Sequence, residues 1–346
     1  MRLWNGWGDE KDYSNVELSS SLKALLSGLL GSGKALPIMT LEKTISKIPE
    51  SKMPHHKLIS TSKEDRLRHT RGQSLSDWFS MHSGAIDCFT DGVAFPRSND
   101  EVKELLLFAS ENNINVIPYG GGTSVVGHIN PERHGKLNLT ISMANMTRLL
   151  DLDPISLLAR FQPGANGPQI ENQLNEEGFT LGHFPQSWEY STLGGWIASR
   201  SSGQQSLKYG RIENLFAGGK IVTPKGTLVI PTCPASSAGP DLRQFLLGSE
   251  GRMGIITEAS VRISPLPKSE YFGAVFFPCW NSGMCAVRKI VQENIDLSMM
   301  RLSNSLETTS LMFMGGKSPE VINKLNSDLL SKGCLLYTSD AADDRC

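Results

Sequence analysis

The stretch at 118–128, PYGGGTSVVGH, holds residue types that could bind a phosphorylated ligand. Its three consecutive glycines each cost about 0.5–1 kcal/mol of backbone entropy relative to alanine, so such a run indicates a close approach to the backbone or a positive φ. Thr123 and Ser124 add two hydroxyls beside backbone N–H groups. A concave group of donors at the end of a strand suits a phosphate or pyrophosphate. Taken alone, the glycine run is more typical of a surface turn that binds nothing.

Two further segments place glycines beside serine and threonine hydroxyls. Residues 182–203 are GHFPQSWEYSTLGGWIASRSSG, and residues 246–260 are LLGSEGRMGIITEAS. Both fall where strands or helices are expected to end, and the ends of these elements leave backbone N–H groups free. The three segments together favour an elongated ligand with a diphosphate in its middle and a flat ring at each end.

The elements that must position these segments alternate between helices and short strands. A capping box at Ser98–Glu101 predicts a helix through about residue 113, Pro168 opens another helix that Gly178 ends, and Asp241 caps a third. Strands are expected at 114–118, 137–142, 157–162 and 255–264, with a hairpin at 219–230. This order predicts an α+β fold with mixed sheets, in two subdomains, rather than one doubly wound sheet.

Composition and charge exclude several classes of protein. The chain has 346 residues, of which 34 are basic and 35 acidic, so nothing in its charge demands nucleic acid. No apolar run approaches the roughly 18–20 residues that span a bilayer, and the N-terminus turns acidic where a signal peptide is apolar. Six cysteines without a C-x-x-C pair predict reduced thiols and no metal site. We expect a cytoplasmic protein whose membrane contact, if any, is peripheral.

The pattern of residue types changes along the chain and predicts four parts. Residues 1–90 are expected to be a helical and irregular N-terminal extension, with leucines from Leu18 to Leu30 at helical spacing and Gly31 as the C-cap. Residues 91–267 form the most patterned domain, and residues 268–334 begin a second domain that we expect to be truncated. Residues 335–346 show no period and resemble translated sequencing-adapter read-through, so we expect a non-native tail.

Two local motifs leave alternatives open. The stretch 28–35, GLLGSGKA, is one residue from a nucleotide-binding P-loop, but Ala35 lacks the hydroxyl that would hold Mg²⁺ and the preceding segment is helical rather than a strand. An NTP site is therefore not expected there. Residues 66–78, RLRHTRGQSLSDW, would either fold over a bound anionic ligand or begin a solvated polar helix.

The combined motifs resemble the FAD-binding PCMH-type flavoenzymes of the vanillyl-alcohol oxidase family. The motifs that carry this resemblance are GGGTS, STLGGW, SRSSG and GSEGRMGIITE, and the similarity extends over about residues 66–315. Within the family, the chain is most similar to the alkyldihydroxyacetonephosphate synthases.

The resemblance implies roles for individual residues. The glycine loop would hold the FAD pyrophosphate, the second segment would run along the ribityl chain and flavin, and the third would close over the adenine side. The residues implied to bind the cofactor are Pro118, Tyr119, Gly120, Gly121, Gly122, Thr123, Ser124, Gln186, Ser187, Ser191, Thr192, Ser199, Arg200, Ser201, Ser202, Glu250, Gly251, Gly254, Ile255 and Ile256.

For two side chains, Arg301 and His128, the sequence leaves two possible roles open. Arg301 would be the catalytic candidate, steering a phosphate or carboxylate of the substrate, or else would form a surface ion pair. His128 is the candidate for covalent flavin attachment, although a hydrogen-bonding role is more expected for a lone histidine at the end of a loop. FAD is therefore expected to be held without a covalent link.

The function implied by the resemblance is an exchange reaction of ether-lipid synthesis. An enzyme of this type replaces the acyl group of acyl-dihydroxyacetonephosphate by a long-chain alcohol, without net redox, with flavin N5 as a covalent handle on the substrate. One alternative is an FAD-linked oxidoreductase that oxidises a 2-hydroxy acid such as lactate or glycolate. Another is a flavin-binding protein without turnover. The expected partners are a small-molecule or lipid-like substrate and, as an open alternative, a second copy of the chain in a homodimer.

Overall fold

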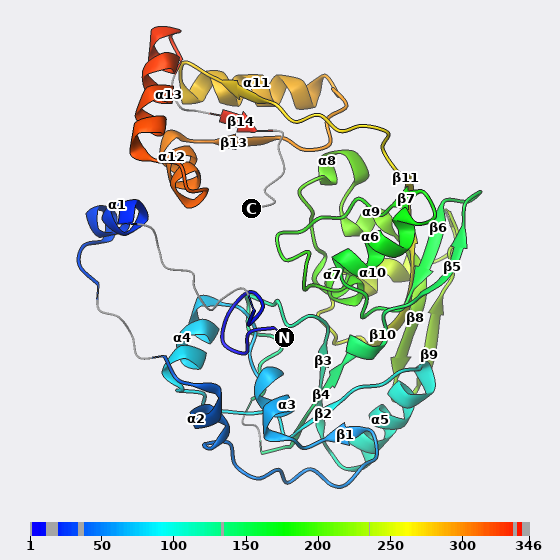
Figure 1. The fold of residues 1–346 in the computed structure, drawn as a ribbon. Helices are drawn as coiled ribbons and strands as arrows, with labels where there is room; N and C mark the ends of the chain where they lie inside the picture. Colours follow the sequence, from blue (N-terminus) through cyan, green and yellow to red (C-terminus); the bar gives the residue numbers. More distant parts are fainter. Residues whose placement is uncertain are drawn as a thin grey trace. The chain divides into compact units, whose positions relative to one another are not determined.

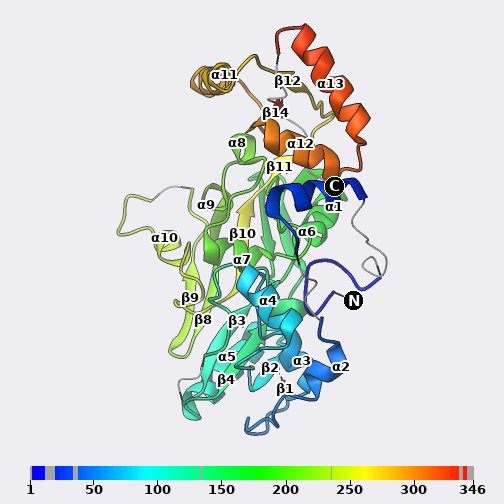
Figure 2. The ribbon, with the colours of Figure 1, turned by 90° about the vertical axis from the view of Figure 1, so that its left-hand side faces the viewer.

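A computed structural model describes residues 2–11, 20–33, 38–132, 135–234, 236–334 and 338–340. The chain divides into two compact units (Figures 1 and 2). Unit 1 comprises residues 1–10, 36–204 and 209–266, and unit 2 comprises residues 11–35, 205–208 and 267–346. The expected domain bounds remain a prediction, although residues 36–90, expected to be an extension, cluster with unit 1.

The first sheet of unit 1 is mixed and carries the glycine loop at one strand end. Its strands are ordered β1 (Ile59–Ser60), β2 (Gly92–Ala94), β4 (Asn138–Ser142) and β3 (Asn115–Tyr119). The pairs β2–β4 and β3–β4 are parallel, while β1 is antiparallel to β2. Because β3 ends at Tyr119, the three glycines at 120–122 follow directly from a strand of this sheet.

Helix α5 (Asn99–Glu111) covers part of this sheet. The Ser98 hydroxyl accepts a hydrogen bond from the Glu101 N–H at 3.2 Å, so the N-cap half of the predicted capping box is present. The Glu101 carboxylate accepts from the Arg97 N–H at 2.6 Å, where a capping box would have the Ser98 N–H. Val102, Leu105 and Leu106 of the helix are buried in one cluster with Leu139 and Ile141 of β4. These contacts hold the parallel strands in place beneath the glycine loop.

The second sheet of unit 1 is antiparallel throughout. Its order is β5 (Leu149–Asp153), β6 (Leu158–Phe161), β10 (Ile255–Arg262), β8 (Phe216–Thr223) and β9 (Gly226–Ile230). The predicted hairpin at 219–230 is the β8–β9 pair, and the predicted strand at 255–264 is β10. The mixed and antiparallel sheets confirm the predicted α+β class.

Helices pack on the second sheet and bring the second glycine-rich segment to it. The core holds buried residues of α6 (Gly167–Asn175), α7 (Leu193–Ser199) and α9 (Ile212–Leu215), such as Ile170, Ile197 and Ile212, with Phe161 and Val261 of the sheet. Strand β5 was not predicted, because only some of its residues are half-buried and its sequence LLDLD shows no clean alternation. Helix α7 was not predicted either, because two glycines stand in its first turn.

The remaining elements of unit 1 are short and are spread along its sequence. They are α2 (Leu41–Ile45), α3 (Lys63–Arg68), α4 (Leu75–Ser83), the 3₁₀ turn Met143–Asn145, β7 (Phe179–Thr180), α10 (Leu242–Leu246) and β11 (Ser264–Pro265). Of the short helix α8 (Ser206–Tyr209), the first three residues are assigned to unit 2 and Tyr209 to unit 1. Residues 2–10 form an N-terminal hook, in which the Leu3 N–H donates to the Gly8 carbonyl at 2.9 Å and the backbones of Arg2 and Asp9 form an isolated antiparallel β-bridge.

Unit 2 contains four helices and a three-stranded sheet in its described residues. The helices are α1 (Ser20–Leu30), α11 (Trp280–Gln292), α12 (Ser305–Met314) and α13 (Pro319–Ser331), and the sheet order is β12 (Ala274–Phe276), β14 (Thr338–Asp340) and β13 (Arg301–Ser303). The expected leucine helix is present as α1, followed by Gly31 at φ +80°, while Leu18 lies outside the described residues.

Two sequence expectations fall in unit 2. Gly28 lies inside helix α1, which is not the strand-to-helix turn that a P-loop needs, and Lys34 and Ala35 lie outside the described residues. Ser339, in the tail expected to be non-native, is paired with Val275 and Leu302 in the sheet. Across the described parts of both units, no helix combines the length and the apolar character that crossing a bilayer requires.

Candidate cofactor site

A cavity of about 340 Å³ opens in unit 1 where the three glycine-rich segments meet. The glycine loop forms one wall, residues 187–201 form the second, and residues 249–256 form the third. Of the residues predicted to bind the cofactor, those that line this cavity are Pro118, Tyr119, Gly120, Gly121, Gly122, Thr123, Ser124, Ser187, Ser191, Thr192, Ser199, Ser201, Glu250, Gly251, Gly254, Ile255 and Ile256. The structure therefore brings together segments separated by more than a hundred residues.

The glycine loop packs directly against the second wall. A Cβ at Gly121 would stand 1.8 Å from the Tyr190 carbonyl oxygen, and a Cβ at Gly120 would stand 2.3 Å from the Thr192 hydroxyl oxygen. Gly122 has φ +65° and lies against the Tyr119 ring. Glycine is thus required by the contact between two walls of the cavity, in addition to any ligand.

Hydrogen bonds fix the second wall. Thr192 is the N-cap of α7, its hydroxyl accepting from the Gly195 N–H at 3.4 Å. The Trp196 indole N–H donates to the Ser191 hydroxyl at 2.7 Å, and that hydroxyl donates to the Ser187 carbonyl at 2.8 Å. Because Trp196 is buried, Ser191 is held in one orientation at the cavity wall.

The third wall has an unusual backbone and one polar atom without a partner. Gly251 has φ +83° and lies against the Pro118 ring, and Gly254 has φ +124° beside the Val222 carbonyl. Among the described residues, the buried Ser249 hydroxyl has no hydrogen-bond partner in the protein. A buried hydroxyl in this state costs free energy unless a ligand or water satisfies it, so Ser249 indicates a polar ligand in the cavity. Ser249 lies in the third glycine-rich segment but was not among the residues predicted to bind the cofactor.

Three predicted cofactor residues do not line the cavity, namely Gln186, Arg200 and Ser202. Arg200 ends helix α7 in the left-handed conformation, at φ +55°. Its guanidinium donates to the Gln244 side chain and lies 3.6 Å from a Glu213 carboxylate oxygen. These partners direct Arg200 towards α9 and α10, and its role in binding the cofactor remains a prediction.

His128 lies at the cavity between the first and third walls. Its Nδ1 is 3.2 Å from the Ser124 hydroxyl and 4.0 Å from a Glu250 carboxylate oxygen. The ring therefore has the hydrogen-bonding surroundings that were expected of a structural histidine.

Apolar residues complete the cavity, and sequence reasoning had not assigned them. Val125, Val126, Ile129, Met143, Pro163 and Trp196 are the larger ones. Val125 and Val126 are 65% and 70% exposed, although they directly follow the glycine loop. Two adjacent exposed valines beside a ligand loop are the signal that could have found them, since a flat ring prefers apolar walls.

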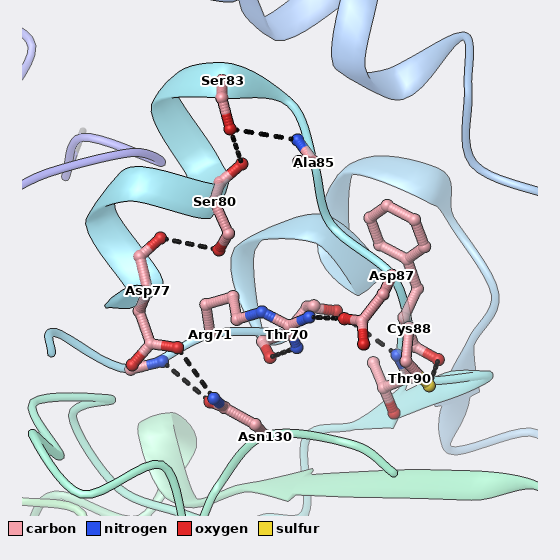
Figure 3. Close-up of polar contacts among 12 residues, drawn as sticks. Thr70, Arg71, Asp77, Ser80, Ser83, Ala85, Asp87, Cys88, Thr90 and Asn130 are labelled. Atoms are coloured by element: carbon pink, nitrogen blue, oxygen red, sulfur yellow. Dashed lines mark hydrogen bonds and ion pairs between the residues drawn. The ribbon is translucent and has the colours of Figure 1, made fainter. Parts of the chain in front are cut away.

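The segment at 66–78 contacts the loop 124–130 that follows the three glycines, and Figure 3 shows its contact with Asn130. Its first residues end helix α3 and its last residues begin helix α4, where Ser74 and Asp77 form a reciprocal capping box. Asp77 also accepts a hydrogen bond from the Asn130 amide at 2.7 Å, and the Gly72 N–H donates to the same amide at 3.1 Å. The Gln73 N–H donates to the Ser124 carbonyl at 2.6 Å. The polar helix start is therefore present and holds both ends of the loop 124–130.

Buried groups near the second wall have shifted pKa values. Burial lowers the pKa of His183 to about 4, so the imidazole is neutral at neutral pH. Its Nε2 lies 3.2 Å from the Ser201 hydroxyl, while its buried Nδ1 has no partner among the described residues. The ring packs edge-on against Trp196, at 4.9 Å between centroids. Neutral His183 thus supports two residues that line the cavity.

Arg301 lies in unit 2, at the start of β13. Its guanidinium donates to a Glu307 carboxylate oxygen at 2.6 Å, and this hydrogen bond lowers the pKa of Glu307. The alternative of a surface ion pair is thus present in the structure. A catalytic role for Arg301 remains a prediction.

The fold and the cavity define a flavoprotein with an FAD-binding domain of the PCMH type. Residues 90–230 match the family model described as FAD binding domain. FAD is accordingly the cofactor.

Comparison with known proteins narrows the class. The chain is 33% identical to an alkyldihydroxyacetonephosphate synthase of Dictyostelium discoideum, over 95% of this chain and 59% of that protein. A solved structure of an alkyldihydroxyacetonephosphate synthase superposes with a TM-score of 0.80 at 31% identity, over 90% of this chain and 62% of that one. A mitochondrial D-lactate dehydrogenase [cytochrome] 1 of Saccharomyces cerevisiae is 32% identical over 72% of this chain and 45% of that protein. The chain spans about six-tenths of the length of the synthases that it matches.

The residues present fit FAD. Thr123 and Ser124 add hydroxyls to the wall that the glycine loop forms, and the Ser249 hydroxyl lacks a partner among the described residues. Apolar walls at Val126 and Ile129 suit a flat ring. Among the described residues no group of three histidine, cysteine or acidic side chains could hold a metal ion.

Proposed function

We propose that this chain is the FAD-binding part of an enzyme of the alkyldihydroxyacetonephosphate synthase type. Such an enzyme exchanges the acyl group of acyl-dihydroxyacetonephosphate for a long-chain alcohol. The observation that carries the proposal is the 33% identity to a synthase over 95% of this chain, because a similarity confined to the cofactor domain would cover less of it. Unit 2 is included in that similarity.

The chemistry of the reaction would come from FAD, through N5 of its ring, and the protein would bind and orient. Main-chain N–H groups of residues 120–124 would hold the pyrophosphate, with the Thr123 and Ser124 hydroxyls. Ser191 and Thr192 would contact the ribityl chain and flavin, and Ile255 and Ile256 would close over the adenine side. Charge-assisted hydrogen bonds contribute about 1.5–3 kcal/mol each, so several of them would hold FAD without a covalent link.

The proposed synthase function also predicts the partners of the protein and its location in the cell. The substrate would be a lipid-like small molecule, and a cytoplasmic enzyme would reach it by peripheral contact with a membrane. A homodimer remains an alternative to a monomer, which the elution volume on size exclusion would decide.

The experiment measures group exchange directly. The purified FAD-loaded protein is given acyl-dihydroxyacetonephosphate and radiolabelled hexadecanol. The expected result is label in an ether lipid, with the absorbance of oxidised flavin restored after turnover. Absence of label in the presence of bound FAD would contradict the proposal.

A second candidate is oxidation of a 2-hydroxy acid, which the identity to D-lactate dehydrogenase favours. An oxidoreductase of this kind would lose the visible absorbance of oxidised flavin when D-lactate is added without oxygen. The synthase proposal expects no bleaching. A protein that binds FAD but does neither would be a binding module.

A further inference from the structure

The N-terminal hook, residues 2–10, contacts the glycine loop although none of its residues lines the cavity. Figure 1 shows this segment in dark blue beside the label N. The hook belongs to unit 1, together with the loop that it contacts. Its role was not expected, since residues 1–90 were considered an extension.

Arg2 connects two walls of the cavity. Its guanidinium donates a hydrogen bond to the Gly121 carbonyl. The same group lies over the Tyr190 ring, 4.8 Å from the centroid, and 5.8 Å from the Trp7 ring. Trp7 in turn packs edge-on against Tyr190, at 5.0 Å between centroids. A cation within about 6 Å of an aromatic face is attracted to it, so Arg2 holds Gly121 and Tyr190 together.

The hook is fastened to helix α3 at both ends. The Arg68 guanidinium donates to the Arg2 carbonyl at 2.8 Å, and it also lies 3.2 Å from a carboxylate oxygen of Glu10. Glu64, one turn earlier on α3, accepts from Arg68 at 2.9 Å. Arg68 has a side chain only 16% exposed, so these bonds are partly shielded from water.

The direction of the Gly121 carbonyl has a consequence for the next amide. In a trans peptide the C=O and the following N–H point in opposite directions. Because the Gly121 carbonyl is turned to Arg2, the Gly122 N–H is turned away from Arg2. The same relation holds at the other end of the loop, where the Ser124 carbonyl accepts from the Gln73 N–H and the Val125 N–H is turned away. Gly122 and Val125 both line the cavity.

We propose that Arg2 is a positioning residue of the FAD site. By holding the Gly121 carbonyl outside the cavity, it keeps the Gly122 N–H directed at the ligand, where it donates to an anionic group. Preorganised donors bind more tightly because the cost of ordering the loop falls outside the binding step. This inference rests on the proposed placement of the FAD pyrophosphate at residues 120–124.

The test compares FAD release from variants of the full chain. Arg2→Gln removes the charge and the planar fork, Arg2→Lys keeps the charge alone, and Arg97→Gln is the control with the same change of charge on an exposed side chain. We expect Arg2→Gln to release FAD about tenfold faster than the control, which corresponds to about 1.4 kcal/mol. Arg2→Lys should lie between the two, because lysine cannot donate and stack in the same geometry.

A readout on the apoprotein separates positioning from general stability. The melting temperatures of the FAD-free Arg2→Gln and Arg97→Gln proteins are compared, and a faster FAD release at equal melting temperature is the result that the positioning role predicts. Equal FAD release from both variants would overturn the proposal, and so would a release rate that changes only in proportion to a loss of apoprotein stability.

A Gly121→Val variant distinguishes this inference from the placement on which it rests. If Gly121→Val retains FAD, the placement of the pyrophosphate fails. If Gly121→Val loses FAD while Arg2→Gln retains it as tightly as the control, only the role of Arg2 fails.

Discussion

The carbonyl oxygen of Tyr190 occupies the space beside Gly121 that a side chain would need, because a Cβ there would lie 1.8 Å away. Normal contacts between a carbon and an oxygen atom are about twice that distance, near 3.3–3.6 Å. The contact joins the loop after strand β3 of the mixed sheet to the segment before helix α7, which packs on the antiparallel sheet, and the cavity lies beside this contact. Every residue other than glycine at 121 must push the two walls apart.

Gly121→Val is expected to abolish FAD retention, because the valine Cβ displaces the Tyr190 carbonyl and opens the wall. The measurement is the visible absorbance of flavin per chain after purification. Gly33→Val is the control, since a Cβ at Gly33 would meet nothing within 4 Å and its φ is not positive. A variant at 121 that remains as yellow as this control would contradict the placement of the cofactor.

Asp77→Ala should destabilise the protein by about 2 kcal/mol, as the loss of an N-cap pair and of a partly buried hydrogen bond predicts. Asp77 closes the capping box of α4 and accepts from the Asn130 amide, whose donor would lose its partner. Denaturant unfolding measures the change. Asp100→Ala, an exposed residue in the first turn of α5, is the control and should cost less than about 1 kcal/mol. Equal costs for the two variants would show that the contact with Asn130 stabilises nothing.

His183 should make the folded state less stable in mild acid. The unfolded chain binds a proton at this residue near its ordinary pKa of 6.5, whereas burial lowers the pKa in the folded chain to about 4. Between these two values the unfolded state binds more protons, so stability falls as the pH falls from 6.5 to 4 and is unaffected above 6.5. The difference in pKa corresponds to a loss of about 3 kcal/mol.

The measurement is denaturant unfolding of the apoprotein at pH values from 4 to 7. His183→Gln removes the titrating ring and keeps a hydrogen-bonding group for Ser201. Its stability should fall less steeply over the same interval. Parallel curves for the two proteins would mean that His183 is protonated in the folded state.

Arg301→Gln is expected to cost less than about 1 kcal/mol of stability, because the pair with Glu307 is partly exposed. If Arg301 steers the substrate, kcat/KM for exchange should nevertheless fall at least about tenfold, as the loss of one charged contact implies. Glu307→Gln is a matched control, since it breaks the same ion pair and keeps the guanidinium. Equal activity of both variants would leave Arg301 with a structural role alone.

Local features of this fold were predictable from the sequence, because they depend on neighbouring residues. The N-caps at Ser98 and Asp241, the strands that became β3, β4 and β10, and the β8–β9 hairpin all lie within a few residues of their expected bounds. The glycine loop was recognisable for the same reason. Its three glycines indicate a stretch of backbone beside which there is no room for side chains.

Contacts between distant segments were not predictable. That Tyr190 fills the space beside Gly121, that Ser249 is buried without a partner, and that Arg200 points to Gln244 depend on how two sheets meet. The spacing of residue types along the sequence does not indicate such contacts. The contacting residues lie more than forty positions apart in the chain, or their surroundings are formed by several elements.

The sequence by itself determined the α+β class, the three glycine-rich segments and the family of the cofactor domain. Tertiary structure alone decided which of the predicted residues share one cavity and which, like Arg200, point elsewhere. It also decided that residues 2–10 support the site, through Arg2 and Arg68. The physical reason is that a glycine or a cap is required by its own backbone, whereas a hydrogen bond between Arg2 and Gly121 exists only once the chain has folded the N-terminal hook against the glycine loop.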